Sequence, residues 1–278
     1  MKTLLLAALL LSASGAAALA NDTMSQLVTG GLEFITSQDV SMDSEDLSVG
    51  PDEVKVVYHF TNKGTDDQHA LVAFPLPDIT GDGDFMVAIP EGGGDNIFGF
   101  KTTFDGEETP STLHQYAFAV NVDQTAVLTA LGVPLEPFGE KTITALNALS
   151  NEDHQKLMHL GMIIPMTYDA GQGEQTDWTP VWTLKSTYTW EADFPAGKTV
   201  EVVHSYKPSV GGTVATTFLA PPYDATDQDR PKLYKDKYCT DDDLIKTIKK
   251  SLKDPSDLYS APYFETWISY IWSTGANW

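Results

Sequence analysis

The stretch DEVKVVYHFTNKGTDDQHALVAFPLPDI, residues 52–79, constrains the fold more than any other part of the chain. Apolar residues occupy alternate positions from Val54 to Phe60, and again from Ala70 to Phe74. Alternation of this kind is typical of strands with one buried face. The polar sequence Asn62-Lys63-Gly64 between the two runs has turn chemistry. We therefore predict two consecutive antiparallel strands.

A similar phrase returns later, in FPAGKTVEVVHSYKPSVGG. Val200, Val202 and His204 fall on one face of a predicted strand, which follows a Pro and Gly turn as the earlier strand does. The similarity is too short to establish a duplication. The pattern predicts a mainly β protein with antiparallel, β-sandwich-like halves.

A small helical insert is predicted between these halves. Asp123 can cap a first helix, Ser150 and Asp153 form a capping-box pattern for a third, and Gly161 ends the region. We therefore divide the chain into residues 1–20, an N-terminal β-rich region 21–122, the helical insert 123–161, and a second β-rich region 162–278.

One more helix is predicted at residues 241–252. Thr240 is the expected N-cap, aspartates fill the first turn and lysines fill the later turns, a charge order that complements the helix dipole. The preceding segment, Ala220 to Lys237, holds three prolines and many charges, and we predict a surface loop there.

The first twenty residues have the features of a signal peptide. Lys2 precedes an apolar run that is too short to span a bilayer, and small residues end the segment at Ala18-Leu19-Ala20. We predict cleavage near Ala20 and a periplasmic or secreted protein. Since no later segment resembles a membrane span, none is expected.

The chain is strongly acidic. It has 39 acidic and 17 basic residues, which gives a net charge of −22. Such a surface repels phosphate backbones, so we expect neither nucleic acid nor anionic lipid as a partner. Solubility in a crowded compartment explains the charge, and attraction to cations or to a basic partner is the alternative.

Sequence motifs for catalysis are lacking. The chain has no G-x-S-x-G, no H-E-x-x-H, no phosphate loop and no dinucleotide fingerprint, and its six histidines are scattered. We expect a non-catalytic binding or scaffolding protein of the cell envelope, with an envelope protein or a glycan as partner. A hydrolase of unfamiliar type that uses dispersed His and Asp residues is the alternative.

The loop DITGDGD could bind a cation. Asp78, Asp82 and Asp84 surround two glycines, and calcium prefers oxygen-rich, flexible loops. The spacing does not match an EF-hand, and a plain turn between strands explains the same residues. We expect no other cofactor.

Aromatic residues concentrate in TDWTPVWTLKSTYTWEADFPAG. Trp178, Tyr188 and Trp190 are candidate ligand-binding residues, because Tyr188 and Trp190 share one face of a strand and an exposed pair could stack on a sugar ring. This would make the protein a carbohydrate-binding module. Burial of the same pair would make it ordinary sandwich core.

Seven phrases occur in an order that resembles a known family. They are NDTMSQLVTGGLEF, DVSMDSEDLSV, LVAFPLPDI, YDAGQG with WTPVWTLKSTYTWEADFPAG, HSYKPSVGG, KYCTDDDL and ISYIWSTGANW. Together they resemble the exported, mostly proteobacterial proteins catalogued as domain of unknown function 4424. The resemblance spans nearly all of the chain after residue 20. It implies a predominantly β, exported protein, and it implies no reaction and no catalytic residues.

The resemblance also concerns Cys239, the single cysteine of the chain. It implies a longer polypeptide, with a further β-rich segment beyond Trp278 that ends near a second cysteine. A disulfide between Cys239 and that partner, absent from this chain, is the expected state in an oxidising compartment. A reactive thiolate is the alternative, which the three aspartates at 241–243 disfavour and the adjacent helix N-terminus favours.

Overall fold

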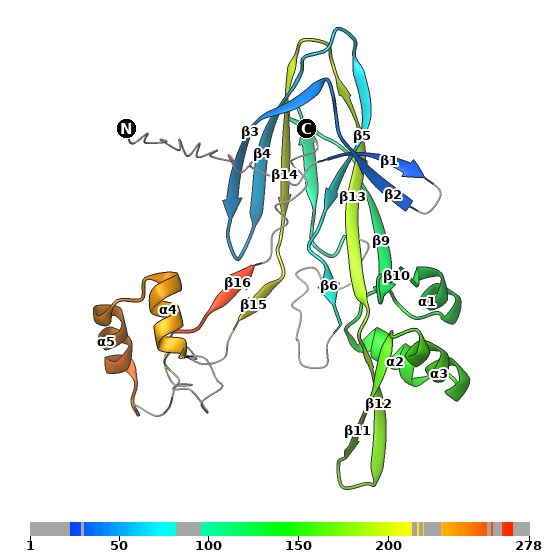
Figure 1. The fold of residues 1–278 in the computed structure, drawn as a ribbon, viewed down its shortest axis with the longest axis vertical. Coiled ribbons are helices and arrows are strands. Elements are labelled where there is room, and N and C mark those ends of the chain that lie inside the picture. Colours follow the sequence, from blue (N-terminus) through cyan, green and yellow to red (C-terminus); the bar gives the residue numbers. More distant parts are fainter. Residues whose placement is uncertain are drawn as a thin grey trace, which may run out of the picture.

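The computed structural model describes residues 23–28, 31–81, 96–212, 216, 219, 229–254, 257 and 263–268. Within them the fold is mainly antiparallel β with short helices, which confirms the predicted class. Figure 1 shows a twisted two-layer sandwich, from whose lower end two groups of helices and a long hairpin extend.

Two antiparallel sheets form the sandwich. The first has the order β10-β9-β13-β5-β1-β2, with β6 also beside β13, and the second has the order β3-β4-β14-β7-β8. The strands of the first sheet are β1 (Thr23–Val28), β2 (Gly31–Ile35), β5 (Gln68–Pro75), β6 (Ile79–Thr80), β9 (Thr112–Ala119), β10 (Val122–Asp123) and β13 (Thr183–Phe194). Those of the second are β3 (Val40–Val49), β4 (Val54–Asn62), β7 (Lys101–Phe104), β8 (Glu107–Glu108) and β14 (Thr199–Tyr206).

The main hydrophobic core lies between these sheets. Alternate residues of β4 and β14 point inward, as the sequence alternation predicts. Phe74 of β5 contacts His204 of β14 across the core, with ring centroids 4.9 Å apart, and Phe60 contacts Phe194 in the same way at 6.1 Å. Burial of these aromatic faces holds the two layers together.

The two similar β phrases are neighbours in space. β4 and β14 pair along their whole length, from Val54 opposite Tyr206 to Thr61 opposite Thr199. Likewise β5, from the first phrase, pairs with β13, from the second β-rich region. The predicted halves are therefore interleaved in two shared sheets and do not form one sandwich each.

Three helices form a second, smaller core below the sandwich. They are α1 (Thr125–Leu131), α2 (Glu140–Asn147) and α3 (Asn151–His159). Each contributes a fully buried leucine, and these leucines pack around Trp182, whose Nε1 donates to the Leu135 carbonyl at 2.7 Å. Ser150 caps α3 as predicted, accepting from the Asp153 amide at 3.1 Å, whereas α1 begins one residue later than predicted, with Gln124 at its N-cap.

A two-stranded hairpin extends beyond these helices (Figure 1). Its strands are β11 (Ile163–Asp169) and β12 (Glu174–Pro180). Only the base is buried, at Ile163 and Pro180. At the tip, the Asp169 carboxylate accepts from the amides of Gly171 and Gly173 at 2.7 and 3.1 Å, an Asx-type turn.

The C-terminal part forms a separate projection, on the other side of the lower end in Figure 1. It contains β15 (Val210–Gly212), α4 (Arg230–Tyr238), α5 (Asp242–Ser251) and β16 (Thr266–Ile268). The loop predicted for residues 220–237 is wrong where α4 forms. Asp229 caps α4 by accepting from the Lys232 amide, and Pro231 occupies the first turn, where its missing N–H costs nothing. The cap of α5 is Asp241 and not Thr240.

Within the described residues, no helix has the length and apolar character to cross a membrane.

Candidate binding surfaces

The predicted aromatic platform lies inside the sandwich. Tyr188 and Trp190 point into the main core and are 2% and 3% exposed. The Tyr188 ring stacks on Phe100 at 4.3 Å, and the Trp190 ring meets His204 at 4.8 Å. Burial also raises the pKa of the Tyr188 hydroxyl. The pair cannot present a face to a sugar, because the second sheet already covers it.

Trp178 lies elsewhere, on β12. Its ring stacks on the His154 ring of α3 with centroids 4.1 Å apart, and it packs against the second core. It is thus separated from Tyr188 and Trp190, which belong to β13, and the structure does not bring the three predicted residues into one site.

The predicted calcium loop is described only at its start. Asp78 forms an ion pair with Lys185 at 3.2 Å, while Asp82 and Asp84 lie outside the described residues. Among the residues that the structure does describe, no group of three or more His, Cys, Asp or Glu side chains is arranged to hold a metal ion. Calcium at this loop stays a prediction.

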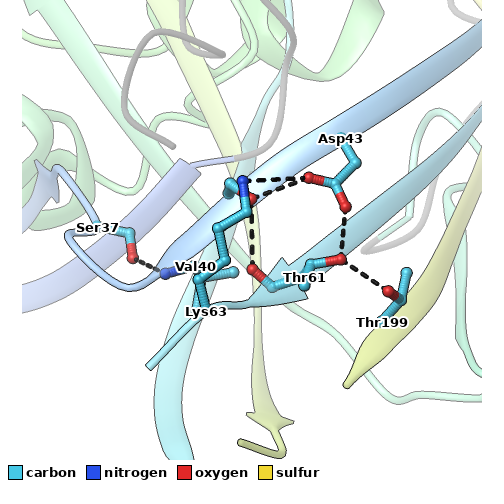
Figure 2. Close-up of polar contacts among 7 residues, drawn as sticks. Ser37, Val40, Asp43, Thr61, Lys63 and Thr199 are labelled. Atoms are coloured by element: carbon cyan, nitrogen blue, oxygen red, sulfur yellow. Dashed lines mark hydrogen bonds and ion pairs between the residues drawn. The ribbon is translucent and has the colours of Figure 1, made fainter. Parts of the chain in front are cut away.

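A polar network covers the outer face of the second sheet (Figure 2). The Asp43 carboxylate accepts from the hydroxyls of Thr61 and Ser41 at 2.5 and 2.9 Å, and lies 3.6 Å from the Lys63 ammonium. Thr61 also contacts Thr199 at 2.7 Å. The bond from Thr61, followed by that from Ser41, holds the pKa of Asp43 below its usual value. These groups are hydrogen-bonded or ion-paired to one another. We therefore interpret the network as a structural one that joins strands β3, β4 and β14.

The neighbouring row on this face brings together a hydroxyl, a histidine and a carboxylate. His59 Nδ1 is 3.1 Å from Ser44 Oγ, and His59 Nε2 is 3.6 Å from Glu201. Both His59 and Glu201 are nearly half exposed on an open sheet face. A catalytic triad needs the three groups within hydrogen-bond reach in one cleft, and here Glu201 is beyond that reach. This row therefore lends the hydrolase alternative no support.

A second exposed histidine lies between two acids on the outer face of the first sheet. His69 Nδ1 is 2.6 Å from Asp193, and Nε2 is 3.1 Å from Glu191. The hydrogen bond to Asp193, followed by the negative charge of that carboxylate, raises the pKa of His69. Because each ring nitrogen of His69 faces a carboxylate, the site favours the protonated, positively charged form of His69.

Helix α5 carries the most distinctive charged surface. Lys246, Lys249 and Lys250 lie at three- and four-residue spacing and so share one side of the helix. We call these three residues the lysine face. Together with Asp242 and the apolar Ile245 they line an open groove.

The lysine face is not neutralised by nearby acids. Asp242 could pair with Lys246 one turn away, but its carboxylate is instead bound by Lys235 of α4 at 3.1 Å. No carboxylate of the described chain forms an ion pair with the three lysines, whereas Lys232, Lys185 and Lys63 each have one. Like charges at this spacing destabilise a helix slightly. The dipole explains lysines in the last turn, but not Lys246.

The distribution of charge along the chain isolates this surface further. The segment from Arg230 to Lys253 holds eight of the 17 basic residues and four of the 39 acidic ones, a net charge of +4. The remaining chain has nine basic and 35 acidic residues, a net charge of −26. Sequence reasoning assigned these lysines to the helix dipole and so missed their concentration.

Comparison with known proteins places the chain in a family. The family model described as "Domain of unknown function (DUF4424)" matches residues 20–278. The chain belongs to this family. The match confirms the resemblance carried by the seven sequence phrases.

Other comparisons add little. No curated protein matches the chain. One solved structure, titled as a putative nutrient binding protein from Legionella pneumophila, aligns with a TM-score of 0.30 and 15% identity, over 62% of this chain and 40% of that one. The aligned part thus spans less than half of the Legionella protein. A similarity at this level carries no argument about the DUF4424 chain.

Cys239 is exposed and ends α4 in the left-handed conformation, with φ 54°. The chain contains no second cysteine, so the disulfide stays a prediction. Its position between α4 and α5 places a thiol inside the basic segment from Arg230 to Lys253.

Proposed function

We propose that this DUF4424 protein is an exported, non-catalytic binding protein of the cell envelope, which binds an acidic partner through the lysine face of α5. The observation that carries the proposal is the set of three lysines on one side of a helix, beside Ile245, that form no ion pair with any carboxylate among the described residues. The chain outside the segment from Arg230 to Lys253 has a net charge of −26.

The physical reasoning is electrostatic. A partner that brings carboxylates or phosphates to the lysine face relieves the mutual repulsion of the lysines, and the attraction weakens with salt. The acidic body repels the same partner, so the complex has one preferred orientation. Export is supported by the signal-peptide pattern of residues 1–20.

A direct test uses poly-glutamate as an acidic probe and poly-lysine as its counterpart. At low ionic strength, the protein should bind fluorescent poly-glutamate, and the variant K246Q/K249Q/K250Q should bind it at least tenfold more weakly. The matched control is K55Q/K63Q/K185Q, which removes the same charge from three lysines outside the segment from Arg230 to Lys253. Equal weakening in the two variants would show that only net charge matters, and would refute the assignment to α5.

Localisation is tested separately. Cell fractionation followed by N-terminal sequencing should find the protein outside the cytoplasm and beginning at Asn21. A cytoplasmic protein with residues 1–20 still attached would contradict the proposed export.

A further inference from the structure

We propose that the acidic partner is an anionic lipid surface, and that α4, α5 and β16 together form a module that docks the protein on it. This inference rests on the proposed function of the lysine face. It adds a second observation, which is the distribution of exposed apolar side chains.

Half of the large exposed apolar side chains of the described chain belong to this C-terminal module. Twelve such residues are exposed, and six of them lie on α4, on α5 or in the segment 263–268 that contains β16. These six are Leu233, Tyr238, Leu244, Tyr263, Phe264 and Trp267. The most basic segment of the chain thus contains or adjoins half of the exposed large apolar residues of the described chain.

Contacts join the parts of the module. The Tyr234 hydroxyl of α4 donates to the Glu265 carboxylate just before β16. Lys235 of α4 binds Asp242 of α5. On the β15–β16 ribbon, Trp267 lies so close to Gly211 that a Cβ there would be 2.1 Å from the indole nitrogen. Glycine at 211 therefore lets the indole lie on the backbone with 45% of the side chain still exposed.

Lysines with interspersed Trp, Phe, Tyr and Leu are the side chains that bind the boundary between lipid headgroups and acyl chains. Here the exposed apolar residues come from α4, from α5 and from the segment 263–268, and most of them have charged residues within two positions in the sequence. This arrangement suits a lipid surface, because a fluid surface requires no fixed complementary shape. An acidic protein would need one shape that fits all three elements.

Charge also sets the orientation. The acidic body is repelled from an anionic bilayer, and the module is attracted. The net charge of −22 predicts that the whole chain is repelled by anionic lipid. The lysine face carries positive charge on α5, so this part of the chain is attracted to the same lipid. Each lysine near such a surface contributes a factor of about five in affinity, so removing the lysine face should cost roughly a hundredfold.

The experiment is flotation of the purified protein with vesicles of phosphatidylcholine containing phosphatidylglycerol, compared with phosphatidylcholine alone. The protein should float only with the anionic vesicles, and K246Q/K249Q/K250Q should remain at the bottom of the gradient. The control K55Q/K63Q/K185Q, whose three lysines lie outside the module, should float with the vesicles.

A second pair of variants tests the apolar contribution. Y263S/F264S should weaken vesicle binding several-fold while poly-glutamate binding stays unchanged. The matched control is I164S/M166S, which removes two exposed apolar side chains from the hairpin, outside the module. Circular dichroism of each variant should match that of the wild-type protein, which checks that the variant is folded.

The outcomes separate the two proposals. If the protein binds poly-glutamate but not anionic vesicles, the lipid inference is refuted, and an acidic protein becomes the partner of the lysine face. If it binds neither probe, the proposed function itself fails. Equal loss of vesicle binding in Y263S/F264S and I164S/M166S would also overturn the docking module.

Discussion

Replacing Asn62 should destabilise the sandwich strongly, because one buried amide joins three parts of the chain. Asn62 ends β4 and is fully buried. Its Nδ2 donates to the carbonyls of Phe194 and Asp66 at 2.7 and 2.9 Å, and its Oδ1 accepts from the Gly64 amide at 2.8 Å. These bonds tie the end of β4 to the following turn and to the end of β13 in the other sheet.

The magnitude follows from the number of bonds lost. Each hydrogen bond contributes about 1 kcal/mol, and the buried Phe194 carbonyl would lose the Asn62 donor in the alanine variant, which adds a further 1 kcal/mol or so. Asn62→Ala should therefore lower the free energy of unfolding by roughly 3–4 kcal/mol. Asn62→Asp should also be destabilising, since a carboxylate would face two carbonyl oxygens.

Equilibrium unfolding in urea, followed by far-ultraviolet circular dichroism, measures this loss. The midpoint should fall by about 1 M or more with little change in slope. Thr65→Ala in the same turn is the control, since this exposed hydroxyl reaches only Asp66 and its loss should cost less than about 0.5 kcal/mol. A loss below about 1 kcal/mol for Asn62→Ala, or wild-type stability for Asn62→Asp, would refute the reasoning.

Three further predictions concern other elements. Trp182→Phe removes the indole bond to Leu135 and part of the ring that fills the second core, and should cost about 2–3 kcal/mol in urea unfolding; an unchanged midpoint would contradict this packing. Ser150→Ala removes the α3 cap and should cost about 1 kcal/mol, a fall of a few degrees in Tm, whereas Ser150→Asp should retain most of the stability. His69→Gln should destabilise the protein only under acidic conditions, because a raised pKa in the folded state gives stability that is complete below the unfolded value of 6.5 and is lost as the pH rises through the folded value. Wild-type and His69→Gln unfolding curves that differ equally at acidic and alkaline pH would exclude the two carboxylates as the cause.

Local patterns predicted local structure well. The alternation around Val54–Phe60 and Val200–His204 correctly marked two strands and their buried faces. The Ser150 capping pattern correctly marked the start of α3. In each case the signal depends on residues a few positions apart, where backbone geometry alone decides which side chains share a face.

Long-range pairing was beyond the sequence. Two similar strand phrases suggested two halves, but nothing in either phrase specifies that β4 and β14 pair with each other. Whether Trp190 is buried or exposed depends on the same long-range pairing, because the second sheet covers its face. A strand pattern shows which residues share a face, and the other sheet decides whether that face is covered.

Helix α4 and the lysine face were missed for different reasons. The prolines of residues 220–237 favour a loop when they are read alone. A proline just after an aspartate cap, as at Pro231, is instead a start signal for a helix. The lysines of α5 had a sufficient local explanation in the helix dipole. The sequence places Asp242 one turn from Lys246, where the two could pair. Only the structure shows that Asp242 pairs with Lys235 of α4 instead, which leaves the three lysines of α5 with no ion pair among the described residues.

The pairing of β4 with β14 has a consequence for how the chain folds. Thr61 and Thr199 are in contact although 138 positions separate them in the sequence. Strand β5 likewise pairs with a strand far along the chain, β13. Neither layer can be completed from the first 160 residues, so a nascent chain leaves hydrophobic strand edges unprotected until β14 emerges. Such distant pairing makes folding slow. Cleavage within the helical insert before that point would yield fragments that cannot fold alone.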